Sequence, residues 1–123
     1  MVLRLSWKIH NSLIRQRDKM IKVSISYFRS DDGCFDHDYY LSTHIPMVKE
    51  VLGDVCVRCE IDKGMFGAKS EQQAEVVAAV QLYVTSVDDF NEKFSVAQKE
   101  IIRDIKNYTN IMPSMQFSEV VSL

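Results

Sequence analysis

The residue types best suited to chemistry gather in one short segment, FDHDYYLSTHIPM, from Phe35 to Met47. If this segment is helical, His37 and His44 lie about 20° apart around the axis, with Tyr40 between them along it. All three side chains are therefore predicted to point into one crevice. Histidine titrates near neutral pH and a tyrosine hydroxyl donates to a developing oxyanion, which favours acid–base catalysis by His37, Tyr40 and His44. The alternative is that both histidines are hydrogen-bonded parts of the scaffold.

Metal and cofactor chemistry find little support in the sequence. Seven residues separate the two imidazoles by about 10 Å along a helix, whereas metal ligands on one helix prefer i, i+4 spacing. Cys56 and Cys59 spell C-x-x-C, but in a predicted strand residues three apart face opposite sides and cannot share an ion. No glycine-rich nucleotide motif and no G-x-S-x-G is present, so neither a metal nor a cofactor is predicted.

The helix that must position these residues is bounded by recognisable signals. Asp36 is placed to cap its start, and Gly53 to end it. An apolar stripe predicted to face a sheet recurs at helical spacing, formed by Leu41, Ile45, Val48 and Leu52. Pro46 cannot donate to the Ser42 carbonyl, so a kink is expected near His44 and Ile45.

Segments with the periodicity of β-strands precede and follow this helix in the sequence. Alternating or two-sided apolar runs predict strands at 21–27, 55–62, 75–84 and 111–121, and a second helix runs from a Ser86 cap to about Lys106. In the second strand, Val55, Val57, Cys59 and Ile61 are expected on one face. The order βαββαβ predicts an α+β, ferredoxin-like domain with a four-stranded antiparallel sheet. Its uncovered sheet face, with small polar groups and one apolar strip, favours a homodimer.

Composition and charge limit the kinds of partner that the protein is expected to bind. The chain of 123 residues is 46% apolar and 26% charged, which is typical of one globular domain. No run approaches the roughly 18 apolar residues that a membrane span needs. Residues 20–123 carry ten basic and sixteen acidic side chains, a net charge of −6, which disfavours nucleic acid. The three cysteines show no framework spacing, which favours a reducing compartment, the cytoplasm.

Residues 1–19 differ from the rest of the chain. They hold five Lys or Arg against one Asp, a net charge of +4, and a second methionine, Met20, stands where strand periodicity begins. We expect the folded domain to occupy residues 20–123. The basic extension is interpreted as a disordered tail or a mis-assigned start, or as a targeting peptide, in which case the location would be an organelle matrix.

Four segments together resemble the EthD family: MIKVS from Met20, FDHDYY from Phe35 with HIPM from His44, LYVTSVDDF from Leu82, and DIKNYTNIMP from Asp104. The resemblance spans about Met20 to Val121. It implies a ferredoxin-like subunit that forms a dimeric α+β barrel, with a pocket in each subunit between sheet and helices. It also places His37, Tyr40, His44 and Pro46 on the family's helix motif.

The family takes its name from a gene cluster for oxidative degradation of an alkyl ether, and its fold is similar to that of cofactor-free monooxygenases and lactone isomerases. The resemblance implies a small apolar or aromatic ligand and a cofactor-independent oxidoreductase or an accessory protein. An isomerase or lyase acting on a lactone or enolisable ketone, and a non-catalytic dimeric binding protein, remain as alternatives. The loop from Gly67 to Ala74 departs from the glycine- and proline-rich loop of many relatives, so any lid over the pocket is expected to differ.

Overall fold

The structure, a computed structural model, describes residues 20–123, so the predictions made for residues 1–19 lie outside the described residues. The elements follow the predicted order βαββαβ. They are β1 (Ile21–Phe28), α2 (His37–Tyr39), the π-helical turn η1 (Tyr40–His44), α3 (Ile45–Leu52), the 3-10 turn η2 (Gly53–Val55), β2 (Cys56–Lys63), β3 (Val76–Val84), α4 (Val87–Asp104), the 3-10 turn η3 (Ile105–Asn107) and β4 (Ser114–Glu119).

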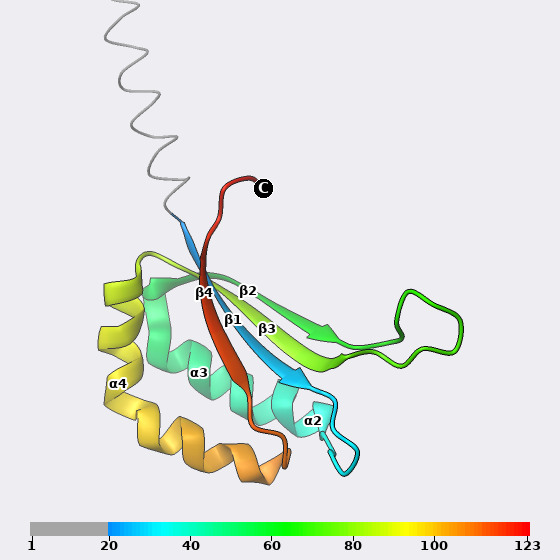
Figure 1. Ribbon diagram of the computed structural model, residues 1–123. Coiled ribbons are helices and arrows are strands. Elements are labelled where there is room, and N and C mark those ends of the chain that lie inside the picture. The colour runs from blue at the N-terminus through cyan, green and yellow to red at the C-terminus, as the bar shows by residue number, and fades with distance from the viewer. Residues whose placement is uncertain (1–19) are drawn as a thin grey trace, which may run out of the picture.

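The four strands form one antiparallel sheet in the order β2-β3-β1-β4. β3 lies inside the sheet, as its two-sided apolar sequence predicts, and β4 begins immediately after Pro113 and pairs with β1. Both helical segments cover the same face of the sheet (Figure 1). This arrangement confirms the predicted α+β, ferredoxin-like fold.

The core lies between that covered face and the two helical segments. Val23, Leu82 and Val84 on the sheet are fully buried, as is Leu52 of α3, and Phe90 of α4 packs against them. Burying a side chain of this size contributes about 1.5–3 kcal/mol relative to leaving it exposed. The alternation of apolar residues in the strands therefore selects which sheet face receives the helices.

The first helical segment is interrupted by a π turn just before Pro46, close to the position of the predicted kink. Asp36 caps its start by accepting a hydrogen bond from the Tyr39 amide, and the Ile45 amide donates to the Tyr40 carbonyl five residues back. This π turn holds one more residue than an α turn. The residues before the turn are consequently out of phase with those after it.

The shift in phase corrects one prediction. Leu41 was expected on the buried stripe, but its side chain is 52% exposed, whereas Tyr40 is buried and joins Ile45 and Val48 in the core. Regular helical geometry of 3.6 residues per turn cannot anticipate this exchange, because the π turn moves the buried position back by one residue.

A bulge corrects the predicted faces of β2. Cys56 pairs with Val84 and Cys59 with Leu82, so both cysteines face the helices, and Val57 between them is 59% exposed. The prediction that Cys56 and Cys59 face opposite sides is wrong, because an extra residue in one strand reverses the alternation. Burial raises the pKa of both thiols, which pack against the core as small apolar groups.

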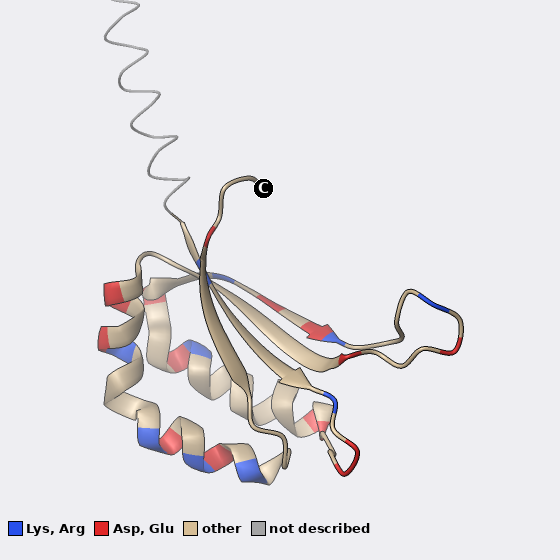
Figure 2. Cartoon of the chain, viewed as in Figure 1, with Lys and Arg blue, Asp and Glu red and all other residues tan. Residues whose placement is uncertain are grey.

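The second helix, α4, begins as predicted and then deviates. The Ser86 side chain accepts from the Asp89 amide at its start, which confirms the predicted cap. Ala97, halfway along, has φ −118° and ψ 15°, outside the helical region. The helix changes direction along its length (Figure 1) and its outer side carries alternating acidic and basic residues (Figure 2).

The other sheet face has no helix over it (Figure 1). At its centre, Ser24 of β1 stands opposite Gln81 of β3 and Gln116 of β4, and Ser26 stands between Ala79 and Ser114. Among residues 20–123, no helix is long and apolar enough to cross a membrane. The loop between β2 and β3 projects away from both helical segments (Figure 1).

Candidate functional site

A cavity of about 550 Å³ lies between the covered face of the sheet and the helices. This volume is within the range of about 300–1,000 Å³ that binds small molecules in proteins. Its wall is mainly apolar and is formed by Ile25, Tyr27, Tyr40, His44, Ile45, Val48, Val80, Phe90, Asn91, Phe94, Ser95, Gln98, Ile101, Ile102, Ile105, Met112, Pro113, Met115 and Phe117. No residue of the loop between β2 and β3 is among them, so this loop forms no lid in the structure.

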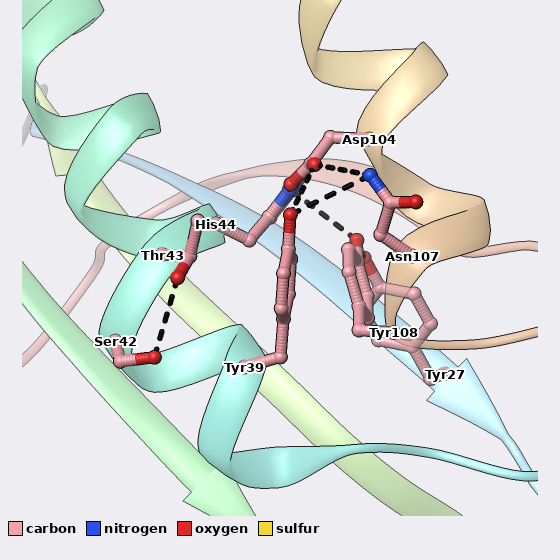
Figure 3. Close-up of polar contacts among 8 residues, drawn as sticks. All are labelled: Tyr27, Tyr39, Ser42, Thr43, His44, Asp104, Asn107 and Tyr108. Carbon is pink, nitrogen blue, oxygen red and sulfur yellow. Dashed lines mark hydrogen bonds and ion pairs between the residues drawn. The ribbon is translucent and has the colours of Figure 1, made fainter.

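One end of the cavity carries a chain of hydrogen-bonded side chains (Figure 3). His44 Nδ1 lies 2.9 Å from Asp104 Oδ2, and His44 Nε2 lies 3.2 Å from the Tyr108 hydroxyl. The Tyr108 hydroxyl lies 2.6 Å from that of Tyr27. Four residues from three different parts of the chain thus form one continuous path.

The direction of each hydrogen bond in the path follows from the groups at its ends. An ionised carboxylate only accepts, so His44 Nδ1 carries the proton that faces Asp104. A neutral imidazole then accepts at Nε2, so Tyr108 donates to His44. Because the single proton of Tyr108 is used there, Tyr27 donates to Tyr108. His44 Nε2 therefore carries no proton and is the final acceptor in this series of hydrogen bonds.

Burial sets the protonation state of this path at neutral pH. It lowers the pKa of His44 below 6.5, and the Asp104 carboxylate only partly opposes this effect. Burial also raises the pKa of Tyr27, Tyr40 and Tyr108, so all three remain phenols. The resting site consequently holds a neutral imidazole, an ionised carboxylate and neutral hydroxyls.

Asp104 is held from its solvent side as well. The Tyr39 hydroxyl donates to Asp104 Oδ1 at 2.7 Å, and the Asn107 amide donates to the same oxygen at 2.9 Å. Burial alone would raise the pKa of Asp104, but these two bonds and the His44 contact lower it below its usual value. The carboxylate is therefore fixed in orientation and remains charged.

The three residues predicted from the sequence do not all meet. Tyr40 and His44 line the cavity, with their rings stacked 5.6 Å apart. His37 lies outside the lining, with its ring 4.7 Å from that of Phe35. The expectation that His37 and His44 share a crevice is wrong, because the π turn between them changes the angle that separates them.

Tyr27, Tyr39, Asp104 and Tyr108 were not identified from the sequence as site residues. Tyr27 offered one signal, since it occupies a core-facing position in an alternating strand and a buried tyrosine hydroxyl requires a partner. Asp104 and Tyr108 lie in the DIKNYTNIMP segment at the end of α4. Their meeting with His44, 60 and 64 residues away, is a tertiary contact that local patterns do not encode.

Within residues 20–123, no three side chains of His, Cys, Asp or Glu are grouped so as to hold a metal ion. His44 and Asp104 already bond to each other. The arrangement is suited to proton transfer at the edge of an apolar chamber.

No protein-family model and no curated protein matches the sequence. Among solved structures, an EthD-like protein from Ralstonia eutropha JMP134 is 38% identical, with a TM-score of 0.81, over 85% of this chain and 94% of that one.

Two more distant structures share the fold. An ethyl tert-butyl ether D (EthD) family protein from Bacillus halodurans C-125 has a TM-score of 0.61 at 12% identity, over 81% of this chain and 97% of that one. HapK from Hahella chejuensis has a TM-score of 0.52 at 11% identity, over 80% of this chain and 90% of that one. The similarity to the Ralstonia protein extends over nearly all the described residues, and the chain belongs to the EthD-like family.

Proposed function

We propose that the protein binds a small apolar or aromatic compound in the cavity and removes a proton from it, with His44 as the final acceptor. The observation that supports this proposal is the path Asp104–His44–Tyr108–Tyr27, which ends at an otherwise apolar chamber of about 550 Å³. A base in such a chamber acts on a substrate that is itself largely desolvated, where electrostatic interactions are strengthened.

The proton moves by a relay. Tyr27 lines the cavity, whereas Tyr108 does not. The Tyr27 oxygen takes the substrate proton while Tyr27 passes its own proton to Tyr108, and Tyr108 passes its proton to His44 Nε2. The resulting imidazolium is stabilised by the Asp104 carboxylate 2.9 Å away. The Tyr40 hydroxyl, at the same end of the cavity, is placed to stabilise the negative charge that remains on the substrate.

Asp104 links His44 to the surface. It accepts from Tyr39 and from Asn107, and Asn107 is exposed to solvent. Loss of the Nδ1 proton toward this side would leave a proton on Nε2, a form that cannot accept from Tyr108. The resting form is therefore restored when the Nε2 proton returns through Tyr108 and Tyr27 to the reaction product or to water in the chamber.

Two reaction classes share this first step. An enolate or phenolate formed in the chamber can react with oxygen, as in a cofactor-independent oxidoreductase, or it can be reprotonated at another atom, as in an isomerase or lyase. We favour the oxidative class, because the family that the sequence resembles takes its name from oxidative degradation of an alkyl ether, and the Bacillus protein carries ethyl tert-butyl ether in its name. Oxygen uptake that accompanies turnover supports it, and turnover without oxygen supports the isomerase or lyase.

Deuterium exchange tests the proton step without knowledge of the natural substrate. β-Tetralone, a neutral apolar ketone with acidic C–H bonds, is incubated with the protein in heavy water under nitrogen, and the loss of its α-proton signal is followed by NMR. We expect protein-catalysed exchange that falls by about 10²–10⁴-fold in His44→Gln, the usual contribution of a general base.

His37 provides the matched control, because it is a histidine of the same helical segment that lies outside the cavity. His37→Gln is expected to retain the exchange rate. If His37→Gln and His44→Gln lower the rate equally, or if neither does, the catalytic role of His44 is wrong. Ligand binding without exchange would instead support the non-catalytic binding protein.

We also propose that the protein forms a homodimer through the uncovered sheet face. The centre of this face carries the small side chains of Ser24, Ser26 and Ala79 together with Gln81 and Gln116, and the charged residues of α4 lie on the other side of the molecule (Figure 2). Small and uncharged polar residues at the centre allow two sheets to approach closely in a two-fold symmetric contact.

A single substitution tests the dimer. Ser26→Arg places a long charged side chain between Ala79 and Ser114 at the centre of the face, and it is expected to shift the mass measured by light scattering from dimer to monomer. Val96→Arg, at an 87% exposed position of α4, is the control and leaves the dimer intact. A wild-type protein that is monomeric at all concentrations contradicts the proposal.

The compartment is proposed to be the cytoplasm. All three cysteines, Cys34, Cys56 and Cys59, are free thiols. Unpaired cysteines persist most readily in a reducing compartment. Fractionation of cells that express a tagged full-length chain checks this location, and recovery in an organelle would assign residues 1–19 a targeting role instead.

A further inference from the structure

α4 contributes three polar side chains to the cavity wall in addition to its apolar ones. Asn91, Ser95 and Gln98 line the cavity at spacings of four and three residues, which bring side chains to one side of a helix. All three are exposed to solvent as well. A side chain that lines a cavity and also meets solvent lies at its opening, so these three residues form a rim.

The opposite side of the opening is apolar. Met112, just before the last strand, and Met115, its second residue, line the cavity and are 76% and 43% exposed. The cavity therefore opens between α4 and the β4 segment. At its inner end stand Tyr27, Tyr40 and His44, none more than 4% exposed. Apolar side chains occupy the wall between these two polar ends.

No charged side chain lines this cavity. The lining contains no Asp, Glu, Lys or Arg, and burial keeps the imidazole of His44 neutral by lowering its pKa. Moving an ionised group into such surroundings without a partner costs several kcal/mol or more. A ligand that fills the chamber must therefore be uncharged when it enters.

We propose that the ligand is a neutral, elongated, mainly apolar molecule with a hydrogen-bonding group at each end, and that Asn91, Ser95 and Gln98 bind the outer group. This inference rests on the proposed function for the inner end, where the reacting hydroxyl or carbonyl group meets Tyr27 and Tyr40. The rim residues determine specificity and take no part in the chemistry.

The rim residues can recognise either a donor or an acceptor. The Ser95 hydroxyl donates to the Glu92 carbonyl at 3.0 Å, so it offers its lone pairs to a ligand hydroxyl. The carboxamides of Asn91 and Gln98 each offer an oxygen and an NH₂ group. Ala97, the non-helical residue of α4, lies between Ser95 and Gln98. The departure from helical geometry thus occurs within the rim itself.

Matched biphenyl probes test this inference. The parent is para-phenylphenol, the second probe carries a para hydroxyl on each ring, and the third replaces the second hydroxyl with a carboxylate. A naphthalene series with the same three patterns supplies a shorter length. In the series that fits the chamber, isothermal titration is expected to show the diol binding about 2–10-fold tighter than the parent, the value of one additional net hydrogen bond.

Two variants locate the effect. Asn91→Leu combined with Gln98→Leu is expected to abolish the preference for the diol and to leave the affinity for the parent within about twofold. Tyr27→Phe weakens the parent and the diol alike, because both place a hydroxyl at the inner end. Lys99→Leu, an exposed position of α4 outside the lining, is the control for changes to the helix surface.

The outcomes separate this inference from the proposed function. If neither parent phenol binds, or if Tyr27→Phe has no effect on binding, the proposed function fails. If the parents bind in a Tyr27-dependent way but the diols show no preference in either series, or a preference that the double variant retains, the two-ended ligand is wrong. A carboxylate that binds more tightly than the diol overturns the assignment of a neutral ligand.

Discussion

The two helical segments that cover the sheet are both interrupted, but by different backbone geometries and at different ends of the cavity. In the first, the π turn at Tyr40–His44 immediately precedes α3, whose second residue is Pro46. In α4, the non-helical residue is Ala97, and neither proline nor glycine occurs in the helix. The first interruption borders the buried polar end of the cavity, and the second borders its rim.

The comparison shows how one sheet face supports both a core and a cavity. The π turn directs Tyr40 and His44 inward in addition to the apolar residues of α3. The break in α4 occurs among residues that line the opening. Two continuous helices would present regular apolar stripes and would favour a filled core. The π turn places Tyr40 in the core where a regular helix would place Leu41.

The largest expected effect is a difference in the free energy of unfolding between substitutions at two leucines of the predicted apolar stripe. Leu52→Ala removes a fully buried side chain and is expected to lower the free energy of unfolding by about 2–5 kcal/mol. Leu41→Ala, at a 52% exposed position before the π turn, is expected to cost less than about 1 kcal/mol. Urea denaturation of both variants measures the difference. Equal losses would mean that the π turn does not shift the phase of the helix in solution.

A smaller loss of stability is expected when the contact between the two helical segments at Asp104 is weakened. Asp104→Asn replaces the carboxylate that binds His44, Tyr39 and Asn107, and is expected to destabilise the protein by about 1.5–3 kcal/mol, the value of a hydrogen bond to a charged group. The pKa of His44, followed by NMR, is expected to fall further, because Asp104 is the group that raises it. An increase in this pKa would contradict the assigned contact.

The pH dependence of stability tests the buried imidazole. Because the pKa of His44 in the folded protein is below its usual 6.5, the unfolded chain binds the proton first as the pH falls. Stability is therefore greatest above about pH 6.5 and decreases below it until the folded pKa is passed. His44→Gln is expected to flatten this decrease in urea titrations. The pKa of His37 is also lowered, so a smaller slope remains.

The smallest expected effect concerns the break in α4. Glycine in a helix interior normally costs about 0.5–1 kcal/mol relative to alanine. Ala97 already departs from helical geometry, so Ala97→Gly is expected to cost less than this amount. Lys99→Gly, two residues later in the helix, is the comparison and is expected to show the full cost. Thermal unfolding resolves the two, and an equal cost would indicate a continuous helix in solution.

Much of the fold was predictable, because strands and helix ends are encoded locally. The alternation in β1, the Ser86 and Asp36 caps and Gly53 after α3 are all confirmed. The errors occurred where one residue was added to a regular element. The β2 bulge moved Cys56 to the inner face, and the π turn exchanged Leu41 for Tyr40.

The candidate site was also predictable only in part. The sequence by itself determined that Tyr40 and His44 belong to one helical segment with an irregularity at Pro46, because proline removes a backbone donor wherever it stands. Only the tertiary structure decided that His37 lies outside the cavity and that Asp104, Tyr108 and Tyr27 complete the path to His44. These partners come from distant parts of the chain, and their hydrogen bonds exist only once the sheet and both helical segments are packed together.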